Sequence, residues 1–542
     1  MTASAVNVLL FLLGTNQFER NTFEFVAQQL ALRHHTTITV KPILIPEEPR
    51  LVKPRLHLVK EKVLKNMVPK AMIEQLEEVG KVVPWTDKYQ FEAMEEPYWT
   101  AHNHSCAKLL NSDLMDSIKK ENVDVAIVYS GNACQLAILH VLGIPYIYFD
   151  TDGFTDETVV ASATPWNLDA VLSNCPNSYN PHSNWLFKRL IKGICLTKEL
   201  LVQSGNYYLS SFLSRKYQML DGAISKLFSN DYEIKKRFGS FPDVNTLKKS
   251  AELYFINSDK LLESEYALPS NVIPVGGLHI DHVRPLFSPW NTTIASAKKG
   301  VIVVSLGSQA NAAGMSASFT KILLNVFSKL TDYRIYWRLG TNLDKVGIDI
   351  TNLPSHINLT TFIPQNDLLA QKRTKLLITN GGMSSIMEGI AHAVPMVGIP
   401  LYGPNLQNLY KLQNKGLAIV VEKYDLSETS LLKAIKTVLE TNKFTTTAAD
   451  MSKAFKSRPE TAFERALYYI EYVGRHRGAK NLNIKHSFIK MINQISAEFL
   501  FELLIFILIC KYAKRVFIAY FFSNKIALEA EKNKKSSKKK KD

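Results

Sequence analysis

Cysteine is scarce in this chain of 542 residues, and so are long uninterrupted apolar runs. The five cysteines are too few and too scattered for a disulfide framework or a zinc site, so we expect no metal. Some of them could pair in an oxidising compartment, but buried free thiols are the expected state. The cysteines are Cys106, Cys134, Cys175, Cys195 and Cys510.

Basic residues are not spread evenly. The formal net charge is +16, but residues 511–542 carry half of this excess. No basic stripe with interleaved aromatic residues occurs in the remaining chain, and nucleic-acid binding requires such a stripe. We therefore expect no nucleic-acid partner. A hydrophobic fraction of 46% over this length predicts a globular protein with at least two domains.

Short apolar runs alternate with helical stretches through the first half, and this rhythm predicts parallel strands connected by helices. A linker with two prolines follows at residues 281–299. The expected strands are Val6–Leu13, Thr36–Ile45, Val123–Tyr129, Ile144–Asp150, Leu253–Asn257 and Val272–Val275, and the expected helices are Asn21–Arg33, Ala133–Leu142 and the long stretch Phe187–Phe228.

The second half repeats the rhythm. Its expected strands are Val301–Ser305 and Tyr333–Leu339, and its expected helices are Ser316–Leu330, Leu431–Glu440 and Met451–Tyr472. We therefore expect an α/β fold in which two domains face each other across a cleft. In open parallel sheets, ligands bind at the carboxyl ends of the strands.

Residues 362–408 have the order of parts that a site for a nucleoside diphosphate needs. Phe362 and Gln365 are suited to stack on a base and to hydrogen-bond it. The apolar run Leu376–Ile378 predicts a buried strand, and Glu388 follows it at a distance that suits ribose hydroxyls.

A glycine turn lies between that strand and Glu388. Asn380, Gly381 and Gly382 open a helix, and glycines there let backbone N–H groups approach a phosphate at the positive helix N-terminus. The apolar run Pro395–Leu401 then leads into a loop, Tyr402–Asn408, at the mouth of the same site.

The segment closely resembles the donor-binding signature of the UDP-glycosyltransferases, specifically the membrane-bound UDP-glucuronosyltransferase family of animals. The other matching blocks are Pro274–Ile280, Gly300–Ala310, Ile335–Gly340 and the C-terminal apolar segment. The resemblance implies the GT-B fold, with two Rossmann-like domains. It implies an N-terminal acceptor-side domain at 1–285, a UDP-sugar-binding domain at 286–480, a transmembrane helix at 495–515 and a basic cytosolic tail at 516–542.

Family membership would imply transfer of a hexosyl group, glucuronosyl or glucosyl, from a UDP-sugar to small lipophilic acceptors. UDP-sugar is then a co-substrate, and no cofactor is expected. The other implied partners are the acceptor, the membrane and, in homo- or hetero-oligomers, further family members.

The resemblance also implies which residues contact UDP-sugar. They are Ser308, Phe362, Gln365, Asn380, Gly381, Gly382, Ser384, Ser385, Glu388 and Asn405. Phe362 replaces a family tryptophan that stacks on uracil, and Asn380 replaces a histidine beside the diphosphate. Pro404-Asn405 replaces an Asp-Gln pair that grips the sugar. The nucleotide contacts are therefore retained, while groups that serve the sugar have changed.

Inverting sugar transfer needs a base for the acceptor hydroxyl and a group that holds this base. In the family these are a histidine after the first strand and an aspartate at the end of a later strand. The catalytic positions here hold Asn16 and Tyr129. His34 and His35 lie a whole helix away, and Asp124 is expected at a strand start. Two hypotheses stay open: an active glycosyltransferase, and a catalytically silent relative that binds nucleotide or partners active family members.

The C-terminal apolar segment Ile495–Cys510 is marginal for a spanning helix, which needs about 20 residues, because Glu498 and Glu502 interrupt it. A buried or interfacial helix is the alternative. The basic residues that follow predict a cytosolic C-terminal side, and Lys539 and Lys540 occupy the positions of a dilysine retrieval signal.

We therefore expect a single-pass type I protein of the endoplasmic reticulum membrane with a lumenal body. Three glycosylation sequons fit this placement: those of Asn103, Asn291 and Asn358.

Overall fold

Two parallel sheets organise the computed structural model, and the expected α/β fold with two Rossmann-type domains is confirmed. The first sheet has the order β3-β2-β1-β4-β5-β6-β7. Its strands are β1 (Asn7–Phe11), β2 (Thr36–Pro42), β3 (Lys60–Leu64), β4 (Val125–Tyr129), β5 (Tyr146–Asp150), β6 (Leu253–Ile256) and β7 (Val272–Pro274).

The structure describes residues 5–12, 17–45, 58–86, 89, 91–170, 175, 184–280, 283–308, 310–340, 346–349, 352–482, 495 and 497–538.

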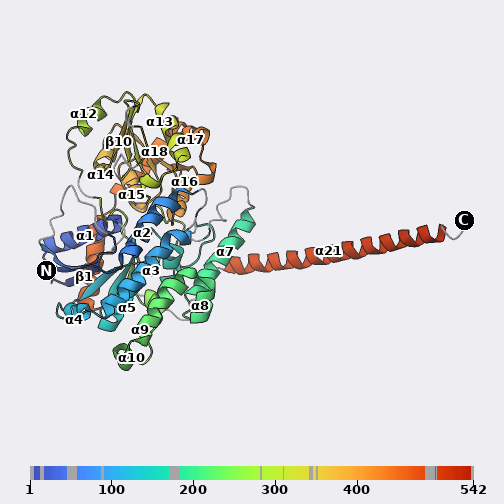
Figure 1. Ribbon diagram of the computed structural model, residues 1–542, viewed down its shortest axis with the longest axis horizontal. Helices are drawn as coiled ribbons and strands as arrows, with labels where there is room; N and C mark the ends of the chain where they lie inside the picture. Colours follow the sequence, from blue (N-terminus) through green and yellow to red (C-terminus); the bar gives the residue numbers. More distant parts are fainter. Residues whose placement is uncertain are drawn as a thin grey trace.

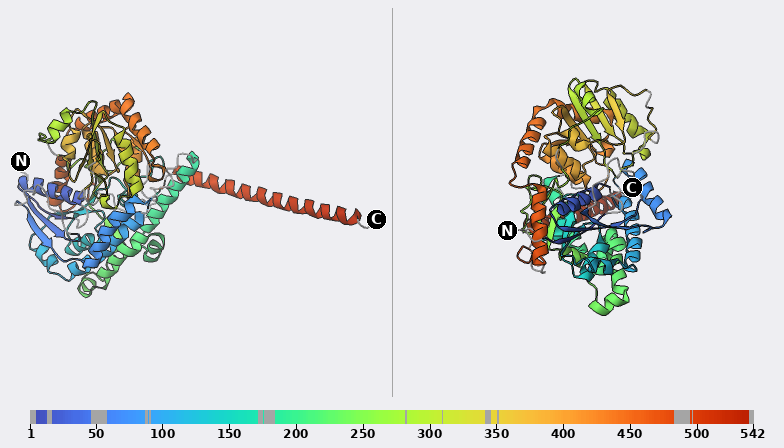
Figure 2. Two further views of the ribbon diagram at one scale, coloured as in Figure 1. Left: turned by 45° about the horizontal axis from the view of Figure 1, so that its top comes forward. Right: turned by 90° about the vertical axis from the view of Figure 1, so that its left-hand side faces the viewer.

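The second sheet has the order β10-β9-β8-β11-β12-β13. Its domain lies above the first in both Figure 1 and Figure 2. The strands are β8 (Gly300–Ser305), β9 (Tyr333–Arg338), β10 (Ile357–Thr360), β11 (Thr374–Thr379), β12 (Met396–Gly398) and β13 (Ala418–Val420).

Helices cover the first sheet and extend below it (Figure 1). The long predicted stretch Phe187–Phe228 is divided into several short helices. The helices are α1 (Gln17–Leu32), α2 (Lys70–Val82), α3 (Phe91–Leu110), α4 (Leu114–Lys119), α5 (Ala133–Leu142), α6 (Asp156–Ala161), α7 (Trp185–Val202), α8 (Tyr207–Leu213), α9 (Gly222–Asn230), α10 (Tyr232–Phe238) and α11 (Val244–Lys249), with the 3-10 helix η2 (Val83–Trp85) and the π-helical turn η4 (Tyr217–Asp221).

The helices of the second half include one correction. The sequence predicts a single helix over Met451–Tyr472, but the chain forms α18 and α19 with a break that contains Pro459, whose ring nitrogen cannot donate a helical hydrogen bond. The helices are α12 (Trp290–Ala295), α13 (Ala317–Ser328), α14 (Gln365–Leu369), α15 (Met383–Ala391), α16 (Asn405–Asn414), α17 (Glu428–Glu440), α18 (Asn442–Lys456), α19 (Ala462–His476) and α21 (Ala497–Lys538), with the 3-10 helices η5 (Ala312–Gly314) and η7 (Lys423–Asp425).

The core strands explain why this architecture forms. In β1, Val8 to Phe11 are fully buried on both faces of the sheet, as expected for parallel strands that helices cover on each side. One of the covering elements comes from the far end of the sequence, because α19 packs its apolar residues, among them Ile470 and Val473, against this sheet.

Four of the five cysteines pair, so the expectation of buried free thiols was wrong for them. Cys106 on α3 joins Cys134 on α5, and Cys175 joins Cys195 on α7. The Cα atoms are 5.7 Å and 6.0 Å apart, inside the range that a disulfide requires. Sequence spacing could not reveal these pairs because each depends on how helices and loops pack. Cys510 is free and exposed.

The C-terminal helix α21 leaves the body next to α7 (Figure 1). Its first turns dock through Arg189, whose guanidinium contacts Glu498, Glu502 and Asp169, each at 2.6–2.7 Å. The two acids that interrupt the apolar segment are therefore the docking groups of this helix. Among the helices of the described residues, none is both long and apolar enough to cross a membrane.

Candidate functional site

The glycine turn lies where β11 ends in the second sheet. Gly381 has a φ of +92°, a conformation that side chains disfavour, and its N–H donates to Thr379 Oγ1 at 3.2 Å. A Cβ on Gly381 would lie 2.5 Å from Leu409 Cγ and 2.7 Å from the carbonyl oxygen of Asn405, at the start of α16. The turn is therefore packed so closely that only glycine fits at this position.

Asn380 in this turn is buried, with only 2% of its surface exposed. Its Oδ1 accepts from the N–H of Gly382 at 3.3 Å, but its Nδ2 has no hydrogen-bond partner within the part of the chain that the structure describes. That amide faces Gly307 of the loop after β8, where a Cβ would collide with it. Ser308, the next residue, is exposed. A buried orphan donor beside two glycine turns fits an oxygen of a phosphate.

Helix α15 begins directly after the turn and aims its N-terminus at the same place. Its N-cap, Gly382, supplies no side-chain hydrogen bond, so the first N–H groups of the helix lack a side-chain cap. Ser384 and Ser385 lie half-buried in this first turn. The uncapped N–H groups and the helix dipole favour an anion here.

Glu388, Gln365 and Ser385 form the second part of the site. Gln365 Nε2 donates to Glu388 Oε2 at 2.7 Å and to Ser385 Oγ at 2.9 Å. Glu388 is 8% exposed, and its Oε1 lies 3.3 Å from His279 Nε2, which belongs to the segment that connects the two sheets. Phe362, three residues before Gln365, is 52% exposed, so its ring is available for stacking. No sequence pattern predicted a role for His279.

The expected donor residues follow four strands of the second sheet: Ser308 follows β8, Phe362 and Gln365 follow β10, Asn380 to Glu388 follow β11, and Asn405 follows β12. Asn405, buried at the start of α16, joins the site through its carbonyl group. No cluster of three metal-binding side chains occurs among the described residues.

The two expected catalytic positions have different outcomes. Asn16 lies outside the described residues, and Tyr129 stands at the end of β4, half-buried. His35 is no substitute base, because its Nδ1 accepts from Val6 N and its Nε2 contacts Glu471 at 3.1 Å. These contacts lie at the amino-terminal ends of the strands, away from the expected site. Asp124 lies at the same end, where its Oδ2 accepts from Asn7 N, as expected for a strand start.

Two aspartates at the end of β5, Asp150 and Asp152, were not predicted as site residues. Asp150 is fully buried and structural: its Oδ2 accepts from Thr155 Oγ1 at 2.7 Å and from Thr158 Oγ1 at 2.6 Å. Asp152 is half-buried, and Tyr129 donates a hydrogen bond to its side chain. The available signal was position alone, since polar residues after a parallel strand lie at its ligand-binding end.

The surroundings of Asp152 alter its acidity. Burial, with the charges of Asp150 and Glu95, raises the pKa of Asp152 to about 7, although Lys216 and the Tyr129 hydrogen bond oppose this shift. A carboxyl group with this pKa changes protonation near neutral pH.

The loop that carries Asp152 touches the second domain through α16. Asn408 Nδ2 donates to the carbonyl of Asp152 at 2.9 Å and to the carbonyl of Gly381 at 3.3 Å. Nearby, Lys411 Nζ contacts both oxygens of Glu263 at 2.8–2.9 Å, and both side chains are buried. One amide therefore joins the glycine turn of one domain to the aspartate loop of the other.

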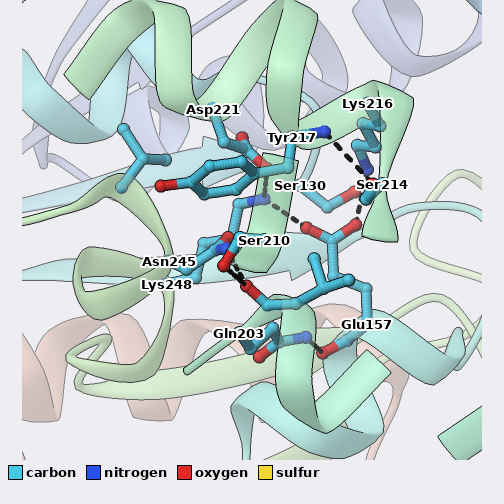
Figure 3. Close-up of polar contacts among 12 residues, drawn as sticks. Ser130, Glu157, Gln203, Ser210, Ser214, Lys216, Tyr217, Asp221, Asn245 and Lys248 are labelled. Atoms are coloured by element: carbon cyan, nitrogen blue, oxygen red, sulfur yellow. Dashed lines mark hydrogen bonds and ion pairs between the residues drawn. The ribbon is translucent and has the colours of Figure 1, made fainter. Parts of the chain in front are cut away.

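A network of buried charges joins α6, η4 and α11 (Figure 3). Glu157 on α6 contacts Lys216 and Lys248, and Lys248 Nζ contacts Asp221 Oδ2 at 2.7 Å. Although burial alone would raise it, the two lysines hold the pKa of Glu157 at about 2. Burial and the charge of Glu157 raise the pKa of Glu199, on α7, to about 7. The network is thus ionised at Glu157 and close to neutral charge overall.

Comparison with known proteins identifies relatives along most of the sequence. The family model described as UDP-glucoronosyl and UDP-glucosyl transferase matches residues 53–527. UDP-glucosyltransferase 2 of Dactylopius coccus is 27% identical over 55% of this chain and 58% of its own. UDP-glucuronosyltransferase 3A2 of Homo sapiens is 29% identical over 70% of this chain and 67% of its own. The human 2-hydroxyacylsphingosine 1-beta-galactosyltransferase is 27% identical over 69% and 63%. For the first and third relatives, the match spans less than two thirds of the relative's length.

Solved structures share the fold at low sequence identity. The glycosyltransferase of kitacinnamycin superposes with a TM-score of 0.56 at 14% identity, over 86% of this chain and 99% of its own. The glycosyltransferase SnogD from Streptomyces nogalater gives 0.52 at 13%, over 86% and 100%. These neighbours support the GT-B arrangement of the two domains.

Proposed function

Because the chain belongs to the UDP-glucoronosyl and UDP-glucosyl transferase family, we propose that it binds a UDP-sugar at the glycine turn and transfers the hexosyl group to a small lipophilic acceptor. The orphan Nδ2 of Asn380 carries this proposal. It is a buried donor without a partner among the described residues, and it lies beside a helix N-terminus without a side-chain cap, which favours a diphosphate.

Each part of the nucleotide has a counterpart in the site. Uracil would stack on the exposed ring of Phe362 and hydrogen-bond Gln365, and the ribose hydroxyls would donate to Glu388. Gln365 donates to Glu388 within the chain, and the nucleotide would replace this internal contact. The diphosphate would accept from Asn380 and from the first N–H groups of α15.

In the proposed reaction the acceptor oxygen forms a bond to the anomeric carbon and gives up its hydroxyl proton to a base. The bond from the anomeric carbon to the UDP oxygen breaks, and its electron pair leaves with UDP. Asn380 and the N-terminus of α15 would stabilise the negative charge that develops on the departing phosphate. Either a glucosyl or a glucuronosyl group is compatible with this site, and the names of the relatives include both.

We expect UDP to bind the purified protein in a calorimetric titration and the Phe362→Ala variant to bind it about tenfold more weakly, because stacking a base on an aromatic ring contributes about 1–3 kcal/mol. Phe287→Ala is the matched control, since Phe287 is a more exposed phenylalanine, at 74%, that precedes α12. Equal affinities for the wild type and both variants would contradict the stacking role, and no binding by the wild type would contradict the proposed function.

A second candidate is a catalytically silent protein that binds nucleotide or partners active relatives. Tyr129 favours it, because a phenol stands where the family places an aspartate. The two functions differ in UDP release: an active enzyme releases UDP from UDP-sugar above the buffer rate, whereas a silent one binds UDP without release.

We further propose that α21 associates with the endoplasmic reticulum membrane and that the body lies in the lumen. Large apolar side chains of this helix are exposed between Leu500 and Phe522, and basic residues follow them. The two disulfides favour an oxidising compartment.

Glycosylation tests this placement. Asn291 is exposed on α12, whereas the Asn103 amide donates to the carbonyl of Met219 and Asn358 is half-buried in β10. We expect a glycosidase-sensitive mass shift in cells that Asn291→Gln removes and Asn103→Gln leaves in place. An unglycosylated wild-type protein in the cytosolic fraction would refute the lumenal placement.

A further inference from the structure

We propose that Asp152 takes the proton from the acceptor hydroxyl, so that a carboxylate on the neighbouring strand end replaces the missing catalytic pair. This inference rests on the proposed function, because it assigns a base to the same reaction. It also removes the main observation in favour of a silent protein, since the lost aspartate has a substitute within hydrogen-bonding reach of its former position.

The sheet register places Asp152 beside Tyr129. Strands β4 and β5 are neighbours, and Tyr129 pairs with Phe149, so the chain reaches Asp152 just beyond the end of the same strand pair. The Tyr129 side chain hydrogen-bonds the Asp152 carboxyl group. Tyr129 is thus a positioning residue that holds a carboxylate in the region where the family carries its aspartate.

The donor site borders Asp152 from the other domain. Asn408 Nδ2 donates to the carbonyl groups of both Asp152 and Gly381. A Cβ on Gly153 would lie 2.9 Å from Cε of Met383, the first residue of α15. The helix N-terminus and the orphan Nδ2 of Asn380 mark the diphosphate position on this same border. Asp152 therefore lies in the acceptor-side domain, at its border with the expected donor site.

The charges around Asp152 suit a base that works near neutral pH. Asp150 and Glu95 disfavour its ionised form, and Lys216 and Tyr129 favour it. Asp150 cannot serve instead, because it is fully buried and accepts hydrogen bonds from Thr155 and Thr158. Lys216 also contacts Glu157, which connects Asp152 to the buried charge network of Figure 3.

The proposed step balances. The ionised Asp152 carboxylate accepts the acceptor's hydroxyl proton as the acceptor oxygen bonds to the anomeric carbon, and UDP leaves with the electron pair of the broken bond. Asp152 then returns its proton to water. Neither an oxidant nor a metal takes part.

Asp152→Asn tests the assignment. We expect UDP release from UDP-glucose or UDP-glucuronate, with an aliphatic alcohol as acceptor, to fall about 10²–10⁴-fold, the usual contribution of a general base. Release with p-nitrophenol, which is largely ionised near pH 8, should fall far less because its oxygen needs no base. The matched control is Asp116→Asn on α4, an exposed aspartate that should leave both rates unchanged. UDP affinity, measured by calorimetry, should be equal in all three proteins.

The pH profile gives a second readout. Only the ionised carboxylate accepts a proton, so wild-type release should rise with pH through about 7, the pKa of Asp152. Tyr129→Phe removes a hydrogen bond that lowers this pKa, and the rise should therefore move to higher pH. Asp152→Glu should restore part of the rate that Asp152→Asn loses.

The outcomes separate the two proposals. A wild-type protein that does not bind UDP contradicts the proposed function itself. UDP binding with equal release by the wild type and Asp152→Asn overturns the role of Asp152 alone. UDP binding without release by the wild type, with either acceptor or with water, also overturns it and supports the silent alternative.

Discussion

Replacing Gly381 with alanine is expected to weaken UDP binding by at least about 100-fold. A side chain at a φ of +92° costs about 1–2 kcal/mol, and the new Cβ would lie 2.5 Å from Leu409 Cγ and 2.7 Å from the Asn405 carbonyl oxygen. The turn must shift, and the shift withdraws hydrogen bonds to the charged diphosphate that contribute about 1.5–3 kcal/mol each. Losing two of them gives the stated factor. Calorimetric titration with UDP measures it.

Gly416→Ala is the matched control for this experiment. Gly416 also has a positive φ, +73°, but its nearest neighbouring atoms are 3.9 Å away and it lies after α16, outside the proposed site. This variant carries the backbone strain without the collision, so its UDP affinity should stay within about twofold of the wild type. A Gly381→Ala protein that is folded and binds UDP with less than tenfold loss would show that the turn does not hold the diphosphate.

Replacing Lys248 with methionine is expected to lower the free energy of unfolding by about 3–5 kcal/mol, the usual effect of breaking a buried ion pair. Lys248 is 1% exposed and lies between the carboxylates of Glu157 and Asp221 (Figure 3). Without it, no other cation of the described residues forms an ion pair with the buried Asp221 carboxylate. Urea unfolding at pH 7 measures the loss.

Two further variants sharpen this test. Lys236→Met, on the exposed surface of α10, should change stability by less than about 0.5 kcal/mol. The double variant Lys248→Met with Asp221→Leu should recover part of the loss, because it removes the unpaired carboxylate and leaves Glu157 with Lys216. If the double variant were less stable than the single one, the loss would come from packing and not from charge.

The same network has a pH dependence. The folded protein holds the pKa of Glu157 at about 2, below its ordinary value of 4.5. The ion pairs of Glu157 therefore stabilise the fold above about pH 4.5, and this contribution is lost as the pH falls towards 2.

Local patterns predicted much of the fold. Helix Ala133–Leu142 and strand Val272–Val275 were predicted within a residue of their bounds, because each is a short apolar run between turn residues. The predicted donor residues Gln365, Asn380 and Glu388 fall within one continuous segment, and the fold brings Gln365 and Glu388 into contact. The single helix expected over Met451–Tyr472 failed because Pro459 interrupts it.

The acceptor side was not predictable in the same way. The role proposed for Asp152 depends on its contacts with Tyr129, on a neighbouring strand, and with Asn408, which lies 256 positions away in the sequence. The pairing of Cys106 with Cys134 likewise depends on two helices that pack together. Such relations arise only when the chain folds, so no local pattern records them.

The docking of α21 through Arg189 has a consequence for how an acceptor arrives. The guanidinium joins the long helix to α7, and the ring of Phe499 fills the space that the absent side chain of Gly193 leaves. Under the proposed membrane attachment, α21 is fixed to the domain that we propose receives the acceptor. A lipophilic acceptor dissolved in the bilayer would then reach that domain by lateral diffusion in two dimensions. The water-soluble nucleotide would arrive from bulk solution.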